Sequence, residues 1–147
     1  MADSKVSELT AATSVGGSDL LYLVQSTTSK KVTVANFLAN AANVTLSGNI
    51  NIGGTAQALA APGAISLTTP ITQLTADATG GTLTLNQGTA GQVKYITMVA
   101  TSGGTYTLSA NIAGSGTVTF DRVGDTAQLL FTSTKWHVVG GTANVTY

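Results

Sequence analysis

The chain has 147 residues, only 8% of them charged, and its six Lys and Arg residues balance six Asp and Glu residues. This composition excludes the basic surface that nucleic-acid binding needs, and the lack of an apolar run of about 18 residues excludes a membrane-spanning helix. Cys is absent, which excludes disulfides and thiolate metal sites. Abundant Thr, Val and Ile, 17 Gly and few helix-forming residues predict an all-β fold.

Residues 1–42 are predicted to form a small N-terminal attachment module of short strands and one short helix. The run at 20–25 is apolar on both faces and indicates a covered strand, and residues 32–42 have the apolar spacing of a helix with Thr33 as its N-cap. Such a module cannot bury enough apolar surface to fold alone, so we expect it to pack against another subunit. The side chains proposed to anchor it on its partner are Leu9, Leu21, Leu23, Phe37 and Leu38.

Residues 43–63 are predicted to form an amphipathic strand followed by a linker. From 43 to 54, apolar residues and glycines occupy the even positions and mainly polar residues the odd ones, a period typical of a strand with one dry face. The small residues at 55–63 indicate the linker. A lone strand needs a partner, either copies packed around a threefold axis or a neighbour's sheet. The residues expected at this oligomer interface are Val44, Leu46, Ile50 and Ile52.

Residues 64–147 are predicted to form a jelly-roll-like antiparallel β-sandwich, because short alternating strands recur between Gly-rich turns. A strand at 92–100 is expected to be central, with apolar side chains on both faces, and Tyr95 and Tyr106 are expected in the core. The other expected strands span residues 64–68, 71–76, 81–86, 104–110, 117–121, 125–131 and 135–140, with an edge strand at 143–147.

The stretch 129–141 contains the only Trp and the only His of the chain. If its two strands pair across the TSTK turn, Phe131 and Trp136 form an aromatic cross-strand pair, so Trp136 is predicted in the core rather than on an exposed ligand platform. His137 alternates to the opposite face, and no Cys or Glu lies nearby to complete a metal site. We interpret this hairpin as a structural element of the sandwich core and not as a binding site.

No catalytic residue, metal site or cofactor is predicted. A single His without a G-x-S-x-G motif gives no nucleophile arrangement, and nothing in the sequence places Asp77, Asp121 or Asp125 in a pocket as a catalytic carboxylate pair. Asp121 and Asp125 flank a D-R-V-G-D turn, which their side chains are expected to hold rather than bind calcium. We therefore expect a non-enzymatic protein.

Two stretches resemble structural proteins of tailed-bacteriophage virions. Near the N-terminus, residues 7–13, 19–25 and 30–38 match the SEL-x-AAT opening, the DLL-x-x-VQ strand and the KKVT-to-Leu ending of a module found on phage fibre and head-decoration proteins. The stretch 91–141 is similar to terminal β domains of such proteins, in which a Gly-Asp turn, an apolar strand and a Trp-bearing strand recur.

The resemblance implies a homotrimeric capsid decoration or cement protein, made in the bacterial cytoplasm and located on the outside of the phage head. Its partners would be the major capsid protein and its own copies, with neither nucleic acid nor membrane involved. Strand addition and apolar burial across joints between capsid subunits would stabilise the head against internal DNA pressure. The alternative is a short head-fibre or tail-fibre component that binds host-surface glycans through its β domain.

Overall fold

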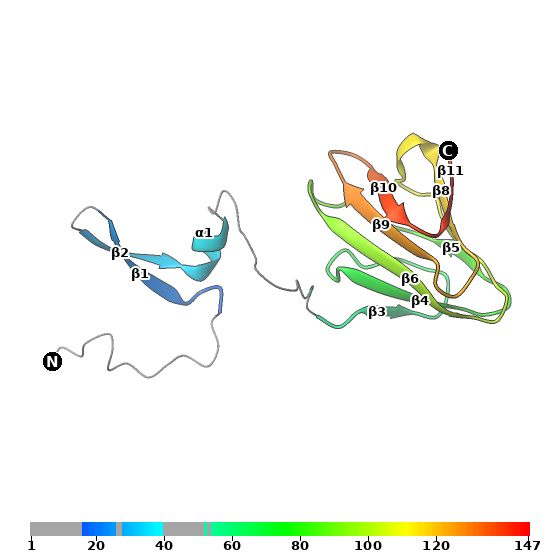
Figure 1. Cartoon of the computed structure of the whole chain (residues 1–147), viewed down its shortest axis with the longest axis horizontal. Coiled ribbons are helices and arrows are strands. Elements are labelled where there is room, and N and C mark those ends of the chain that lie inside the picture. Colours follow the sequence, from blue (N-terminus) through cyan, green and yellow to red (C-terminus); the bar gives the residue numbers. More distant parts are fainter. Residues whose placement is uncertain (1–15, 26–27, 40–51, 53) are drawn as a thin grey trace. The chain divides into compact units, whose positions relative to one another are not determined.

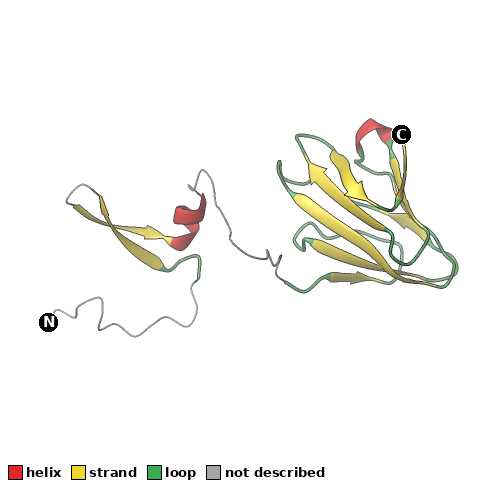
Figure 2. Ribbon diagram, viewed as in Figure 1, coloured by secondary structure: helices red, strands yellow, loops and turns green. Residues whose placement is uncertain are grey.

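The computed structural model describes residues 16–25, 28–39, 52 and 54–147, and the chain divides into two compact units, Met1–Ile50 and Asn51–Tyr147. Figure 1 shows both units, coloured along the sequence. The described part of the C-terminal unit consists of strands joined by loops and one short 3₁₀ turn, whereas the described part of the N-terminal unit combines a hairpin with a helix (Figure 2).

In the N-terminal unit, strand β1 (Leu20–Gln25) pairs antiparallel with strand β2 (Thr28–Thr33), and helix α1 (Val34–Ala39) follows directly. The predicted strand at 20–25 is confirmed, and the helix is shorter than the predicted 32–42 at its start because Val32 and Thr33 belong to β2. The predicted N-cap is also confirmed, since the backbone N–H of Asn36 donates to Thr33 Oγ1 at 3.2 Å.

Two packed sheets form the C-terminal unit, with the five-stranded sheet in front in Figure 1. The five-stranded sheet has the order β10-β9-β6-β4-β3, with β3 at Gln57–Leu59, β4 at Ile71–Ala76, β6 at Val93–Thr101, β9 at Thr126–Phe131 and β10 at Trp136–Gly141. The four-stranded sheet has the order β11-β8-β7-β5, with β5 at Gly81–Leu83, β7 at Tyr106–Leu108, β8 at Thr117–Phe120 and β11 at Asn144–Thr146. A 3₁₀ turn, η2, spans Ala113–Ser115.

The all-β, two-sheet prediction is confirmed, but the purely antiparallel, jelly-roll-like pairing is wrong for three strand pairs. Strands β3 and β4, β4 and β6, and β5 and β7 run parallel. From β4 to β7 the chain alternates between the two sheets, so neighbours within a sheet are separated by one strand of the opposite sheet. A return through the opposite sheet restores the chain direction, and this crossover produces parallel pairs.

The N-terminal border of the sandwich also differs from the prediction. Residues 57–59, expected within the linker, form edge strand β3, whereas 64–68 contributes only a bridge between Ala64 and Thr84. The Gln57 side chain explains the difference: its Nε2 donates to Ala64 O at 2.9 Å, and its Oε1 accepts from Ser66 N at 2.8 Å and Thr72 Oγ1 at 3.0 Å. These bonds align an otherwise featureless run of small residues with β4.

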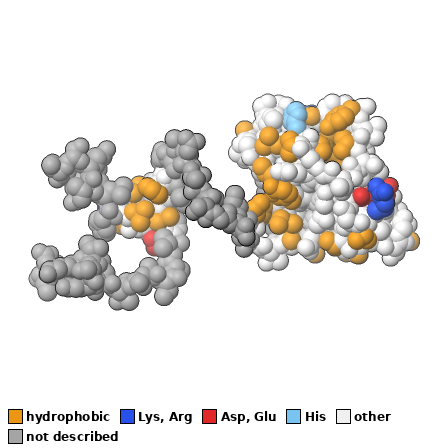
Figure 3. Space-filling view, in the orientation of Figure 1, with side chains coloured by type: hydrophobic (Ala, Val, Ile, Leu, Met, Phe, Trp, Pro, Cys, Tyr) orange, Lys and Arg blue, Asp and Glu red, His pale blue; other side chains and the backbone are white. Residues whose placement is uncertain are grey.

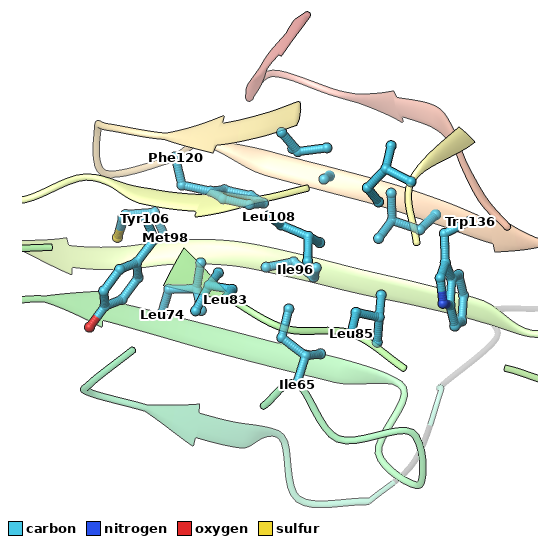
Figure 4. Close-up of a cluster of buried hydrophobic side chains, with 14 of the residues drawn as sticks. Ile65, Leu74, Leu83, Leu85, Ile96, Met98, Tyr106, Leu108, Phe120 and Trp136 are labelled. Carbon is cyan, nitrogen blue, oxygen red and sulfur yellow. The ribbon is translucent and has the colours of Figure 1, made fainter. Parts of the chain in front are cut away.

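The hydrophobic core lies between the two sheets, where Ile96 and Met98 of β6 contact the inward side chains of the other strands (Figure 4). Tyr106 is fully buried, as predicted, and its hydroxyl donates to Thr75 O at 3.2 Å. The prediction that Tyr95 belongs to the core is wrong, because β6 is covered on one face only. Tyr95 is half-buried on the outer face of the five-stranded sheet, between exposed Val93 and Thr97.

Candidate functional site

Of the residues predicted to anchor the protein, Leu21 and Phe37 have described side chains. Leu21 is half-buried in β1, and Phe37 in α1 is 49% exposed. Leu20, which the sequence analysis did not select, is 45% exposed at the start of β1. Large apolar side chains of this unit are therefore exposed within the unit itself (Figure 3).

The remaining predicted interface residues are only partly placed. Leu23 lies in β1 and Leu38 in α1. Ile52 is exposed. The residues that lie outside the described ranges are Leu9, Val44, Leu46 and Ile50.

A groove of about 310 Å³ opens on the outer face of the five-stranded sheet, over β6 and β9. The Tyr95 and Gln128 side chains form one wall, and these residues are direct cross-strand partners. Thr97 and Thr126 are the next cross-strand pair on the same face of the sheet and also line the groove. The sequence analysis missed this site because it assigned Tyr95 to the core.

Hydrogen bonds hold the walls of the groove in place. Gln128 Nε2 donates to Tyr95 Oη at 3.2 Å. The hydroxyls of Thr126 and Thr142 lie 3.3 Å apart, and Thr142 Oγ1 donates to Gly124 O at 3.0 Å. The groove is thus lined by an aromatic ring, a carboxamide and hydroxyls whose positions are largely set before any ligand arrives.

Two glycines at the end of β10 keep the groove open. Gly140 pairs with Gln128 and Gly141 with Ala127, after a register shift at Val138/Gly140. Gly141 has a φ of +131°, and a Cβ there would overlap the backbone of Thr126. A Cβ on Gly140 would meet only Gln128 Oε1, at 3.7 Å. The space beside Gln128 therefore exists because β10 carries no side chains at these positions.

Lys94 is a fully buried cation on the core face of β6. Its Nζ donates to Thr69 O at 2.5 Å and lies 3.5 Å from Thr69 Oγ1, and no carboxylate in the described part of the chain forms an ion pair with it. Burial lowers the pKa of Lys94 from its usual value to about 8. Because its amine is buried and bonded to a loop carbonyl, Lys94 joins β6 to the 66–70 loop and is not available to a ligand.

Asp125 holds the predicted D-R-V-G-D turn, as expected. Its Oδ2 accepts from the backbone N–H groups of Asp121 and Arg122, both at 2.9 Å. Burial alone would raise the pKa of Asp125, but these two hydrogen bonds, a further one to Asp121 and the charge of Arg122 hold it below its usual value. The carboxylate is fully engaged in structure.

The other candidate groups do not assemble into a reactive cluster. His137 is exposed, as the alternation predicts, and its Nε2 lies 3.2 Å from Thr132 Oγ1. Among the described residues there is no group of three or more His, Cys, Asp or Glu side chains that could hold a metal ion. Within the same ranges, no helix is long and apolar enough to cross a membrane.

Comparison with known proteins adds no relative. No protein-family model, curated protein or solved structure matches this chain.

Proposed function

We propose that this protein is a non-enzymatic virion structural protein that decorates the outside of a phage head and stabilises it. The observation that carries the proposal is the exposure of Leu20 and Phe37 on the N-terminal unit, whose described residues form one hairpin and one short helix. A unit of this size gains little from its own core, so a partner surface is needed to cover these side chains.

The energetic contribution of that contact is modest for each copy. Leu20 and Phe37 retain about half of their accessible surface, and burying the remainder contributes roughly 1 kcal/mol each. Several such units linked in one oligomer bind a repetitive surface far more tightly than one does. The proposed partners are the major capsid protein and two further copies of this chain in a homotrimer, with the strand predicted at 43–54 between subunits.

The C-terminal unit suits a projecting role. Its core is continuous, and its buried charged side chains, Lys94 and Asp125, make backbone hydrogen bonds. Its outer surface is mainly uncharged, and the acidic and basic side chains visible on the face in Figure 3 gather at one end. These features fit a rigid, neutral domain on a virion exterior, and they provide no catalytic arrangement.

Quantitative mass spectrometry of purified virions tests the position on the particle. A copy number comparable to that of the major capsid protein supports decoration of the head. A few copies per particle would instead favour the alternative, a short head-fibre or tail-fibre component.

A binding assay with undecorated heads tests the attachment surface. The L20D/F37D variant should lose binding, while Val123→Asp, at a 63% exposed site in the C-terminal unit, should bind as the wild type does. Equal binding by L20D/F37D and wild type would refute attachment through this surface. Circular dichroism and the oligomeric state of each variant, compared with wild type, separate loss of contact from loss of folding.

A further inference from the structure

We infer that the groove over β6 and β9 is a binding site for a neutral saccharide. The inference rests on the outer face of the C-terminal unit and is independent of how the N-terminal unit attaches. The groove offers three chemical groups to a ligand: the Tyr95 ring, the Gln128 carboxamide and the Thr97 hydroxyl.

Each of these groups has hydrogen-bonding capacity left over. Tyr95 Oη accepts from Gln128 and keeps its own O–H as a donor, while Gln128 keeps its Oε1 and one N–H. The Thr97 hydroxyl has no partner among the residues that the structure describes. Donors and acceptors therefore alternate over a short distance, as recognition of a polyhydroxylated ligand requires.

The Tyr95 ring supplies the apolar part of the contact. Tyr95 is half-buried and lines the groove. The C–H groups on one side of a sugar ring pack against the electron-rich face of an aromatic side chain. On the far side of Gln128 from the ring, Gly140 and Gly141 carry no side chains, so a flat sugar ring can lie close to the β10 backbone there.

The groove carries no charge, which selects for a neutral ligand. The cross-strand row through Tyr95 contains Ile71, Gln128 and Gly140, and the next row contains Gln73, Thr97 and Thr126. Lys94 lies beside Tyr95 in sequence but points into the core. Nothing in these rows would pair with a sialic acid or uronic acid carboxylate, so acidic sugars would lose solvation without compensation.

An extended peptide fits this site less well. The groove lies over the middle of the sheet, where β6 is paired on both sides and β9 lies between β6 and β10. The backbone groups of these strands are used in the ladder, and strand addition needs a free edge. Recognition here depends on side chains, and the volume of about 310 Å³ suits a small ligand.

The test uses the full-length chain on an array of neutral oligosaccharides, made of hexoses and N-acetylhexosamines, and acidic ones that carry sialic or uronic acid. The neutral oligosaccharide with the strongest signal is then titrated by calorimetry against four variants. Tyr95→Ala should weaken binding about tenfold or more, and Tyr95→Phe, which keeps the ring, should weaken it less. Gly140→Leu should block the groove, because the side chain would lie beside Gln128 Oε1 without overlapping the backbone.

The control variant is Thr82→Ala, at an exposed position of β5 in the opposite sheet, and its affinity should equal that of the wild type. Thermal unfolding of every variant shows whether the variant is folded, so that a lost binding signal can be assigned to the site and not to loss of folding. The inference is overturned by no binding to any neutral oligosaccharide, by a preference for acidic ones, or by wild-type affinity in both Tyr95→Ala and Gly140→Leu. Capture of an extended peptide that Gly140→Leu abolishes, with no saccharide bound, would also overturn it.

Discussion

Phe131 and Trp136 face each other across the hairpin that joins β9 to β10, with ring centroids 5.2 Å apart and an angle of 62° between the ring planes. This edge-to-face geometry contributes about 1 kcal/mol to stability, in addition to the contribution from burying the apolar area of the two rings. Trp136 Nε1 also donates to Asn86 O at 2.8 Å, which fixes the 86–92 loop to the hairpin. One residue thus connects the end of the sandwich core to a loop distant in sequence.

Trp136→Phe should destabilise the C-terminal unit by about 2 kcal/mol. The substitution leaves a cavity where the larger ring was and leaves Asn86 O without its donor. Urea unfolding followed by far-ultraviolet circular dichroism measures the change. Tyr147→Phe, at a largely exposed position, should change stability by less than about 0.5 kcal/mol. An unchanged unfolding midpoint in Trp136→Phe would contradict the role assigned to this residue.

The strands and the Phe131–Trp136 pair were predictable because they follow from local alternation. Strand β10 and strand β9 were expected from their apolar period, and pairing across a short turn sets which residues oppose each other. The parallel pairs were not predictable in this way, because they depend on the order in which the chain visits the two sheets. Strand β3 depends on hydrogen bonds from Gln57 to residues seven to fifteen positions away, which leave no periodic signal.

Lys94→Met should stabilise the protein at pH 7 by about 2 kcal/mol, since it replaces a buried charge that has no counter-ion among the described residues by an apolar side chain of similar length. In the wild type the pKa of Lys94 is about 8 when folded and about 10.4 when unfolded. The cost of burying the cation is complete below pH 8 and is relieved as the pH rises towards 10.

Thermal unfolding at pH 7 and at pH 9.5 checks both parts of this prediction. The difference in stability between Lys94→Met and the wild type should shrink at the higher pH. Lys135→Met, at an exposed position, should show neither effect. A Lys94→Met protein less stable than the wild type at pH 7 would show that the bond to Thr69 O outweighs the cost of the buried charge.

Asp125→Asn should destabilise the protein at pH 7 by about 2 kcal/mol, because a neutral amide replaces a carboxylate that accepts two backbone hydrogen bonds. The pKa of Asp125 is lower in the folded state than in the unfolded chain, so its contribution is present above about pH 4 and is lost as the pH falls through the folded value. The difference between variant and wild type should therefore shrink as the pH falls below about 4.

Asp121→Asn provides the comparison for the same turn. Asp121 is on the surface and pairs with Arg122 at 3.2 Å, an interaction that contributes less than about 1 kcal/mol. Its substitution should have a smaller effect at pH 7 than Asp125→Asn. Equal effects of the two substitutions would mean that Asp121 contributes as much to the turn as Asp125, which would contradict the role assigned to the buried carboxylate.

The groove could not be predicted from the sequence, although its residues lie in correctly predicted strands. Val93, Tyr95 and Val99 occupy one face of β6 and Ile96 and Met98 the other, so the pattern does not decide which face is covered. The one local signal, Lys94 on the same face as Ile96, favours the wrong answer, because Lys is rarely buried. Only the packing of the second sheet identifies the open face.

Gly103 and Gly104 are adjacent, but each is required for a different reason, the first by its backbone conformation and the second by close packing. Gly103 has a φ of +103° and open space around its missing Cβ. Gly104 has no such dihedral angle, but a Cβ there would overlap the carbonyl of Asp77 and the backbone nitrogen of Gly80. Gly103→Ala should therefore cost about 1–2 kcal/mol, the penalty of the left-handed region. Gly104→Ala should cost about 3 kcal/mol or more, since two backbone segments must separate.

Urea unfolding of the two alanine variants measures this difference directly. Gly91→Ala repeats the first case, with a φ of +85° and no atom near the added Cβ, and should match Gly103→Ala. A larger loss of unfolding free energy in Gly103→Ala than in Gly104→Ala would mean that the dihedral angles of the turn between β6 and β7, and not its packing, require glycine. If Gly104→Ala loses more stability, as expected, the close contact between the 77–80 and 101–105 turns is the stronger limit on the sequence. This contact holds the two sheets together at this end of the sandwich.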